Sequence, residues 1–424
     1  MKRVAISTLC VVTLLISSPV CSQGLPTATP GEVGMSGPRL ERIDDYVERH
    51  IEANHFAGAV TLVARHGKIA QLKAYGMQDI ESGTPMSTDS IFRFYSMTKP
   101  ITSVAVMMLF EEGRFLLTDP VSKYLPEFKG LEVSVEEVDE ATGEKVATAE
   151  PANREVSVRD LLRHTSGLTY GFWGKSAVDK MYLDRGVLSK DATLEETVTK
   201  LGNIPLKHQP GTVWEYSVST DVLGRFVEVV SGRPFDEFLE DRIFKPLGMK
   251  DTGFFVPEEK SGRLTTVYVP NEDNTAIQPQ ASDKARDFTK PPTYFSGGGG
   301  LVSTAADYLR FAQMLLNRGE LEGTRILGPE TIELMTRDHL GEIPIWNDVG
   351  SYGFGLGFMV YPDRGDSGSI LSPGSFGWGG MAHTTFWVDP EEELIGIFLI
   401  QILPRAPIPY RDLFKPVVYQ AITH

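Results

Sequence analysis

Ser96 and Lys99 are the residues whose types and spacing could perform nucleophilic chemistry. Residues three positions apart share one face of a helix, so the hydroxyl and the amine of Ser96-Met97-Thr98-Lys99 can touch. A serine needs a neighbouring base to become a good nucleophile, and a lysine supplies one where an apolar environment disfavours its ammonium form. N–H groups at the start of a helix also suit a developing oxyanion. By itself, the same spacing fits a serine N-cap followed by a surface lysine.

The segment around this pair favours the catalytic interpretation. Residues 96–112 are predicted to form a helix that is apolar on nearly all sides, which is typical of a central, buried helix. Pro100 would lie in its first turn, where a missing N–H costs least, and Gly113 would end it. A buried lysine without a function is costly. We therefore predict that Ser96 is a nucleophile activated by Lys99.

Two later segments could complete such a site. Tyr216 lies at a predicted loop–helix junction, from which its phenol could share a proton with Lys99; a structural tyrosine is the alternative. Gly377-Trp378-Gly379-Gly380 precedes a predicted strand, and glycines there let the backbone approach a ligand closely. An ordinary tight turn would use the same residues.

Taken in order, these motifs resemble the serine β-lactamase and penicillin-binding protein superfamily. Its pattern is S-x-x-K, then Y-x-N or Y-x-S, then K-T-G or a variant of it. Within the superfamily the chain looks most like the family VIII carboxylesterases, which share the class C β-lactamase fold. The resemblance runs from about Ile43 to Ile400 and rests on five stretches: 94–100, 161–168, 216–218, 297–301 and 378–380.

The resemblance implies a role for each matching residue. Ser96 would be acylated, and Lys99 and Tyr216 would share the work of the general base. The backbone N–H groups of Ser96 and Met381 would form the oxyanion hole. The sequence does not decide whether Lys99 or Tyr216 takes the first proton.

Two departures from the β-lactamase pattern bear on the substrate. Val218 stands where a β-lactamase has an asparagine that bonds the amide of the antibiotic, and Trp378 replaces the lysine that binds its carboxylate. The expected substrate is therefore a small ester with apolar parts, and weak β-lactam hydrolysis stays compatible with the machinery. Substrate contacts are expected from Trp378, Gly379, Gly380, Val218, Tyr170 and Trp173.

Hydrophobic periodicity predicts strands near both ends of the chain and helices between them. Strands are expected at 57–64 and 68–75, joined by a turn at His66-Gly67, and at 352–360, 381–388 and 394–400. Helices are expected at 38–52, 157–164, 220–231, 235–244, 304–317 and 411–422, and a surface hairpin turns near Thr142-Gly143.

This order predicts an α+β fold with one antiparallel sheet formed by the N- and C-terminal segments, flanking helices, and an inserted, mainly helical domain. The hydrolase domain is expected to span residues 23–424, with its α/β part at about 36–115 and 296–424 and its helical part at about 116–295.

The composition limits the partners of the protein. With 41 Lys and Arg against 56 Asp and Glu, the net charge is −15, which makes nucleic acid a poor partner. The eight histidines lack metal-site spacing and no nucleotide-binding motif occurs, so neither a metal nor a cofactor is expected. The absence of G-x-S-x-G argues against the α/β-hydrolase fold. The expected partner is a small-molecule ester or β-lactam, and no oligomeric state is predicted.

Residues 1–22 are typical of a secretory signal peptide, with Lys2 and Arg3 before an apolar run at 4–17 and small residues after it. We expect cleavage near Ser22 and a periplasmic or secreted protein. The run is too short for a spanning helix. Both cysteines, Cys10 and Cys21, lie in this segment, so the mature protein would contain no disulfide or thiolate nucleophile. Lipid attachment at Cys21 is disfavoured by the bulky residue before it.

Three functions therefore remain in competition. The first is a carboxylesterase that uses Ser96, Lys99 and Tyr216. The second is a class C-like β-lactamase, a D-Ala-D-Ala carboxypeptidase or a D-aminopeptidase. The third is a binding protein on the same fold that has lost catalysis, against which the retention of all three residues argues.

Overall fold

The computed structural model describes residues 25–138, 145–273, 275–281, 286–346, 352–362, 365, 368–403 and 408–424. The predicted signal peptide and the predicted turn at Thr142-Gly143 lie outside these residues.

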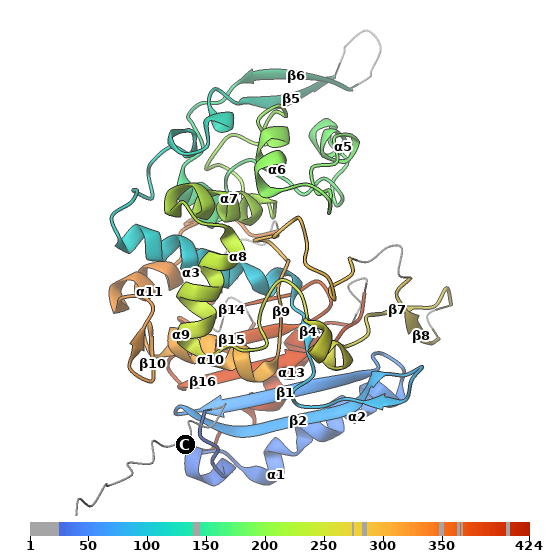
Figure 1. Cartoon of the computed structure of the whole chain (residues 1–424). Helices are drawn as coiled ribbons and strands as arrows, with labels where there is room; N and C mark the ends of the chain where they lie inside the picture. Colours follow the sequence, from blue (N-terminus) through green and yellow to red (C-terminus); the bar gives the residue numbers. More distant parts are fainter. Residues whose placement is uncertain are drawn as a thin grey trace, which may run out of the picture.

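An antiparallel sheet lies in the lower part of the molecule as drawn in Figure 1. Its strands, within the described residues, follow the order β12-β13-β14-β15-β16-β1-β2-β3. The bounds are β1 Gly58–Arg65, β2 Lys68–Asp79, β3 Thr84–Pro85, β12 Gly353–Phe354, β13 Met359–Val360, β14 Phe376–Gly379, β15 Thr385–Asp389 and β16 Leu394–Leu399. N-terminal β1 pairs with C-terminal β16, from Val60 opposite Leu399 to Arg65 opposite Leu394. This pairing of the two chain ends confirms the predicted fold class.

Helices cover both faces of the sheet, and the side chains of β1 alternate between two cores. Val63 packs in the core that contains Ile43 of α2 (Arg42–Glu52) and Phe414 of α13 (Tyr410–Tyr419). Leu62 packs in the other core, with Ile101 of α3 (Thr98–Glu111) and residues of α10 (Ala305–Leu316). Because side chains of a strand alternate in direction, two covered faces leave every residue of β1 buried.

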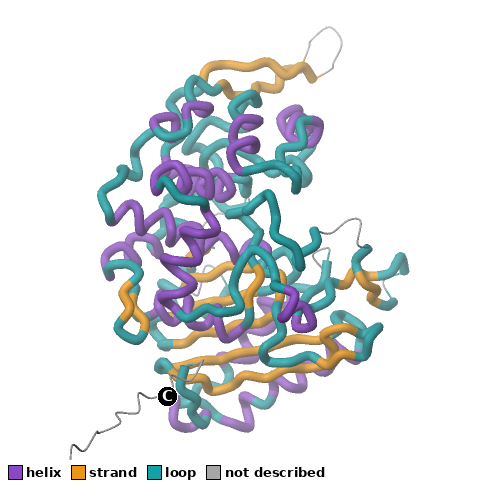
Figure 2. The backbone as a smooth tube through the Cα atoms, in the orientation of Figure 1, coloured by secondary structure: helices purple, strands orange, loops and turns teal. Residues whose placement is uncertain are grey.

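A mainly helical region lies on the α3 side of the sheet (Figures 1 and 2). Its helices are α4 Val158–Leu162, α5 Ala177–Asp184, α6 Leu194–Leu201, α7 Ser219–Ser231, α8 Phe235–Leu239 and α9 Lys245–Leu247. The hairpin of β5 (Glu132–Val138) and β6 (Lys145–Pro151) lies at its far end. Within the described residues, the remaining elements are α1 Gly37–Leu40, α11 Pro329–Thr336, β4 Phe92–Arg93, β7 Tyr268–Pro270, β8 Ile277–Pro279, β9 Val302–Ser303, β10 Glu320–Leu321, β11 Thr324–Arg325 and six short turns of 3-10 or π-helix.

Most predicted elements are present, with two informative differences near the C-terminus. The strand predicted at 352–360 is instead the hairpin of β12 and β13, because Gly357 adopts a φ of 99° and turns the chain. The strand predicted from residue 381 begins only at Thr385. The residues before it form a tight turn, in which the N–H of Gly380 donates to the carbonyl of Thr384 at 2.7 Å. An additional strand, β14, precedes that turn.

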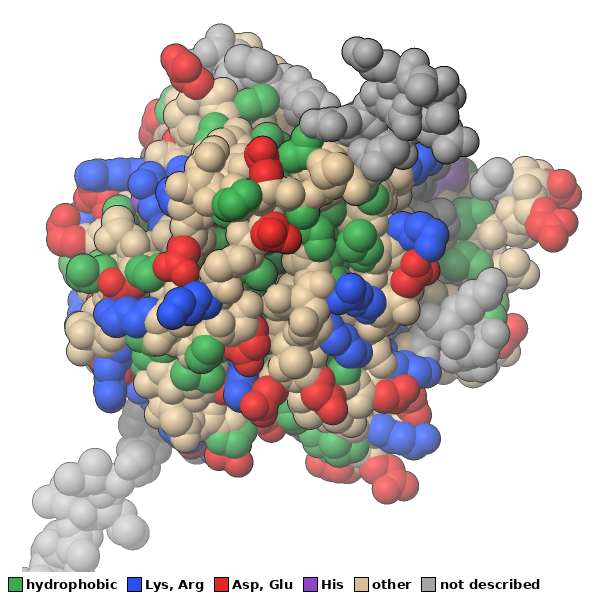
Figure 3. Space-filling view, turned by 90° about the horizontal axis from the view of Figure 1, so that it is seen from above, with side chains coloured by type: hydrophobic (Ala, Val, Ile, Leu, Met, Phe, Trp, Pro, Cys, Tyr) green, Lys and Arg blue, Asp and Glu red, His purple; other side chains and the backbone are tan. Residues whose placement is uncertain are grey.

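Acidic and basic side chains are interspersed over the surface seen from above in Figure 3. Within the described ranges, each helix is too short or too polar to cross a bilayer.

Candidate active site

Ser96 lies in a short 3-10 turn, Tyr95–Met97, that leads directly into α3. The turn is held from several directions. β4 pairs with β9 just before it, and the carbonyl of Met97 accepts a hydrogen bond from the Tyr308 hydroxyl at 2.8 Å. Tyr95 adopts a φ of 44°, a left-handed conformation that is uncommon for residues other than glycine and is frequent at functional sites.

Lys99 lies one helical turn later and is 1% exposed. Its Nζ is 3.4 Å from Ser96 Oγ and donates to the Tyr170 hydroxyl at 2.8 Å and to the carbonyl of Gly298 at 2.7 Å. A carbonyl can only accept, so one N–H of the amine is committed to Gly298. The other two directions point toward hydroxyls, which can exchange protons with it. The predicted contact between Ser96 and Lys99 is therefore present in the structure.

Tyr216 presents the face of its ring to Lys99, with Nζ 4.5 Å from the ring centroid. Its hydroxyl accepts a hydrogen bond from Nε1 of Trp378 at 3.3 Å. Among the described residues, the phenol that bonds directly to Lys99 is that of Tyr170, which the sequence analysis predicted only as a substrate contact. The lysine is thus enclosed by two tyrosines.

Burial controls the protonation of the groups around this lysine. It raises the pKa of Tyr170 well above 10, with further contributions from Tyr216 and Asp221. Tyr170 is consequently a neutral phenol at ordinary pH and can donate or accept a hydrogen bond. Burial, followed by the charge of Lys99, lowers the pKa of His164 well below 6.5. This histidine is therefore neutral, and its Nδ1 lies 3.2 Å from Ser217 Oγ.

A buried carboxylate that the sequence analysis missed holds the Gly298 carbonyl in place. Asp221 is 1% exposed and accepts hydrogen bonds from Ser296 Oγ at 2.5 Å and from the N–H of Gly298 at 3.1 Å. A Cβ at position 298 would lie 2.5 Å from an oxygen of Asp221, so only glycine fits there. The available signal was an acid in the first turn of a predicted helix, five residues after Tyr216.

The end of β14 approaches the Ser96 turn very closely. A Cβ at Gly380 would clash with the carbonyl oxygen of Phe94, and Thr384 Oγ1 donates to that same carbonyl at 3.3 Å. Met381 follows Gly380, and both Met381 and Ser96 line one cavity. The predicted oxyanion donors therefore lie on segments that are packed against each other.

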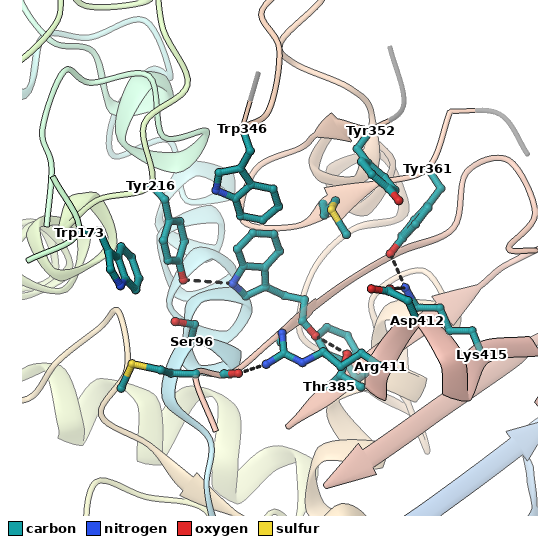
Figure 4. Close-up of a pocket in the computed structure, with 16 residues that line it drawn as sticks. Ser96, Trp173, Tyr216, Trp346, Tyr352, Tyr361, Thr385, Arg411, Asp412 and Lys415 are labelled. Atoms are coloured by element: carbon teal, nitrogen blue, oxygen red, sulfur yellow. Dashed lines mark hydrogen bonds and ion pairs between the residues drawn. The ribbon is translucent and has the colours of Figure 1, made fainter. Parts of the chain in front are cut away.

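The cavity has a volume of about 560 Å³. Figure 4 shows Ser96 beside Tyr216, with the indoles of Trp173 and Trp346 on either side of that ring. Trp346, which the sequence analysis did not select, stacks on Trp378 with ring centroids 6.0 Å apart. The site residues predicted from the sequence that line this cavity are Ser96, Trp173, Tyr216, Trp378, Gly379, Gly380 and Met381.

Two other predicted substrate-binding residues are not among those that line this cavity. Val218 is fully buried, and the hydroxyl of Tyr170 accepts a hydrogen bond from Lys99. Its ring contacts Trp173, with ring centroids 5.3 Å apart. Within the described ranges, no cluster of three or more His, Cys, Asp or Glu side chains is arranged to hold a metal ion.

The fold and this arrangement define a class of serine hydrolases in which a lysine, rather than a histidine, lies beside the nucleophile. The chain belongs to the Beta-lactamase family, whose model matches residues 43–414.

Three proteins are similar to this chain over most of its length. An uncharacterised protein of Mycobacterium tuberculosis is 37% identical over 366 residues, which are 83% of this chain and 88% of that protein. Esterase EstB of Burkholderia gladioli is 31% identical over 385 residues, 86% of this chain and 90% of the esterase. The structure of EstCE1, a hydrolase with promiscuous acyltransferase activity, superposes with a TM-score of 0.75 at 26% identity, covering 90% of this chain and 99% of that one. These similarities confirm the predicted resemblance to esterases of this fold.

Proposed function

We propose that the protein is a carboxylesterase that cleaves short-chain carboxylic esters through an acyl-enzyme on Ser96. The observation that carries the proposal is the 3.4 Å contact between Ser96 Oγ and Lys99 Nζ at an aromatic cavity. The similarity to esterase EstB supports the same reaction class.

The proposed reaction has two halves. Ser96 Oγ adds to the ester carbonyl carbon while its proton passes to the group formed by Lys99 and Tyr216. The oxyanion is held by the N–H groups of Ser96 and Met381. The bond to the alcohol then breaks, and the alcohol leaves with the proton. A water molecule repeats the sequence on the acyl-enzyme and releases the carboxylic acid.

The cavity walls near Ser96 support an apolar ester as the substrate. Trp173, Trp346 and Trp378 offer large aromatic surfaces that bury acyl or alcohol groups and exclude water. A β-lactam can enter the same chemistry, which supports weak activity on antibiotics. A main activity on β-lactams or on D-Ala-D-Ala peptides would appear as nitrocefin or peptide turnover rivalling that of 4-nitrophenyl butyrate.

Active-site labelling tests the proposal. We expect a fluorophosphonate probe to modify Ser96, because the probe reacts with activated serine hydroxyls, and Ser96→Ala to lose both the label and ester turnover. Peptide mapping by mass spectrometry locates the label. Modification of Ser296 instead would refute the assignment, and an unmodified wild-type protein would favour a binding protein without catalysis.

A further inference from the structure

Among the described residues, sulfur occurs only in methionine. Both cysteines, Cys10 and Cys21, precede these residues, so a two-electron oxidant such as a peroxide meets thioethers rather than thiols. Most of the described methionines are buried, and two are exposed, Met77 at 41% and Met381 at 40%. Their nearly equal exposure predicts similar reactivity toward a small dissolved oxidant.

The two exposed methionines differ in what surrounds them. Met77 lies on β2 and is not among the residues that line the cavity. Met381 lines the cavity together with Ser96 and Trp173. Met359 also lines the cavity, but it is half-buried. Within the part of the chain that the structure describes, Met381 is therefore the methionine that combines an exposed side chain with a place in the cavity wall.

The turn that carries Met381 is fixed in place by its neighbours. The N–H of Gly380 donates to the carbonyl of Thr384 at 2.7 Å, and the carbonyl of Gly380 accepts a hydrogen bond from the guanidinium of Arg411. Gly380 also packs so closely against the segment before Ser96 that an added Cβ would clash with its backbone. A chemical change in the Met381 side chain is therefore met by the cavity wall and is not relieved by a shift of the turn.

We propose that Met381 is a site of reversible oxidation that lowers the activity of the enzyme. The O–O bond of a peroxide breaks and an S–O bond forms at the thioether, so two electrons pass from the sulfur to the peroxide. The methionine becomes a sulfoxide, and the second peroxide oxygen leaves as water or an alcohol. The inference rests on the proposed esterase function, because the sulfoxide would act on the ester bound at Ser96.

The added oxygen lowers activity because of where it is introduced. A thioether is apolar and flexible, whereas a sulfoxide is polar and chiral. An ester group that packs against the sulfoxide beside Trp173 and Trp378 must displace its water without replacing those hydrogen bonds, which disfavours binding. The N–H of Met381 is also a predicted oxyanion donor. We expect kcat/KM for 4-nitrophenyl butyrate to fall about 5-fold or more, as for a polar group left unpaired.

Treatment of the purified enzyme with hydrogen peroxide, in the presence of a metal chelator, tests the proposal. Peptide mass spectrometry measures the fraction of each methionine that has gained one oxygen atom, and kcat/KM for 4-nitrophenyl butyrate is measured on the same samples. The loss of activity should follow the oxidation of Met381 and not that of Met77. Methionine sulfoxide reductases should restore the activity, since they reduce sulfoxides and leave other oxidative damage in place.

Matched variants assign the effect to one residue. Met381→Leu and Met77→Leu each remove one exposed thioether and keep an apolar side chain, and each is compared with itself before and after peroxide. Met381→Leu should keep its own kcat/KM, whereas Met77→Leu and Met359→Leu should be as sensitive as the wild type. Met381→Gln introduces a polar side chain without an oxidant and should have a lower kcat/KM than Met381→Leu.

The outcomes separate this inference from the proposed function. A wild-type enzyme that keeps its kcat/KM after complete oxidation of Met381 would overturn the inference and leave the esterase intact. The same holds if Met381→Leu is inactivated as fast as the wild type, or if Met359→Leu is the variant that resists. An untreated enzyme that cleaves no ester and takes no label at Ser96 would refute the esterase itself.

Discussion

Two tyrosines, Tyr170 and Tyr216, contact Lys99 in the structure, whereas the sequence predicted only Tyr216 as its partner. Tyr170 bonds to Nζ at 2.8 Å, while Tyr216 covers Nζ with its ring and receives the indole N–H of Trp378. Tyr216 lines the cavity beside Ser96, whereas Tyr170 does not. We therefore propose that Tyr216 and Lys99 transfer protons to and from the substrate and that Tyr170 holds the amine in position.

Substitutions at these residues separate the roles. We expect Lys99→Ala and Tyr216→Phe each to lower kcat by about 10²–10⁴-fold, because members of one proton-transfer unit cannot replace each other. Steady-state hydrolysis of 4-nitrophenyl butyrate measures the loss. Tyr170→Phe is the matched variant, since it also removes only a hydroxyl. A larger loss in Tyr170→Phe than in Tyr216→Phe would contradict the role given to Tyr216.

Local spacing made some site residues predictable and left others hidden. Ser96 and Lys99 lie on one helical turn, so their contact follows from helix geometry alone. Asp221, Gly298 and Arg411 meet the site through tertiary packing between distant segments. No spacing rule in a single sequence encodes such contacts, and these residues became visible only in the folded molecule.

At the scale of elements, β14 and the turn that follows it determine where Met381, one of the two predicted oxyanion donors, lies. Only four residues form β14, and two of them, Gly377 and Gly379, are poor strand formers. Its pairing with β15, which sets Gly379 opposite Thr385, compensates for this low propensity. The strand was missed in the sequence because its stability comes from its neighbours.

The close approach at Gly380 gives a test of this element. Gly380→Ala should lower kcat strongly with little change in melting temperature, because the added Cβ meets the Phe94 carbonyl and forces β14 away from the Ser96 turn. Gly31→Ala, where a Cβ meets nothing within 4 Å, is the control. Full activity in Gly380→Ala would contradict this prediction, because it would show that the turn accommodates the added Cβ without displacing the predicted oxyanion donor.

The packing of α2 against α13 contains a pair of histidines, with Nδ1 of His50 2.8 Å from Nδ1 of His55. Such a bond needs one proton donor and one acceptor, so it is lost when both rings are protonated. Burial, then the charges of His55 and Arg49, lowers the pKa of His50 to about 4. An unfolded histidine titrates near 6.5.

Stability should therefore fall as the pH is lowered from about 6.5 toward 4, since the unfolded chain binds the proton more readily in that window. We expect His50→Gln to show a smaller drop in melting temperature between pH 7.5 and pH 5 than the wild type. His66→Asn, at an exposed turn between β1 and β2, is the control. An unchanged drop in His50→Gln would assign the acid sensitivity to other groups.

At the scale of the whole molecule, hydrophobic periodicity correctly predicted the sheet and the helices that cover it. Strands of alternating or continuous apolar residues near both chain ends have few ways to be buried, and an antiparallel sheet between them is the simplest. The helix predicted at 235–244 is divided in the structure into α8 and a π-helical turn, Glu240–Phe244. Such local changes of winding depend on packing and leave no mark on the hydrophobic pattern.

The first residues give a prediction of their own. We propose that the chain is exported and cleaved after Ser22, so that the mature protein begins at Gln23. Intact mass and N-terminal sequencing of protein from the periplasm or medium of a bacterial host would check this. Retention of Met1 in that fraction would contradict the proposal, and a diacylglycerol mass on Cys21 would indicate lipid attachment instead.

Because β1 pairs with β16, the sheet that supports the site can form only after the C-terminal strands have been translated. The nucleophile and β1 are made early, but the turn that carries Met381 and the strand that closes the sheet are made near the end. A chain that stops before β14 lacks the turn that carries Met381, and the edge of its β1 lacks the C-terminal neighbour β16, which favours aggregation. We therefore expect premature termination in the last part of the message to yield an inactive protein that aggregates.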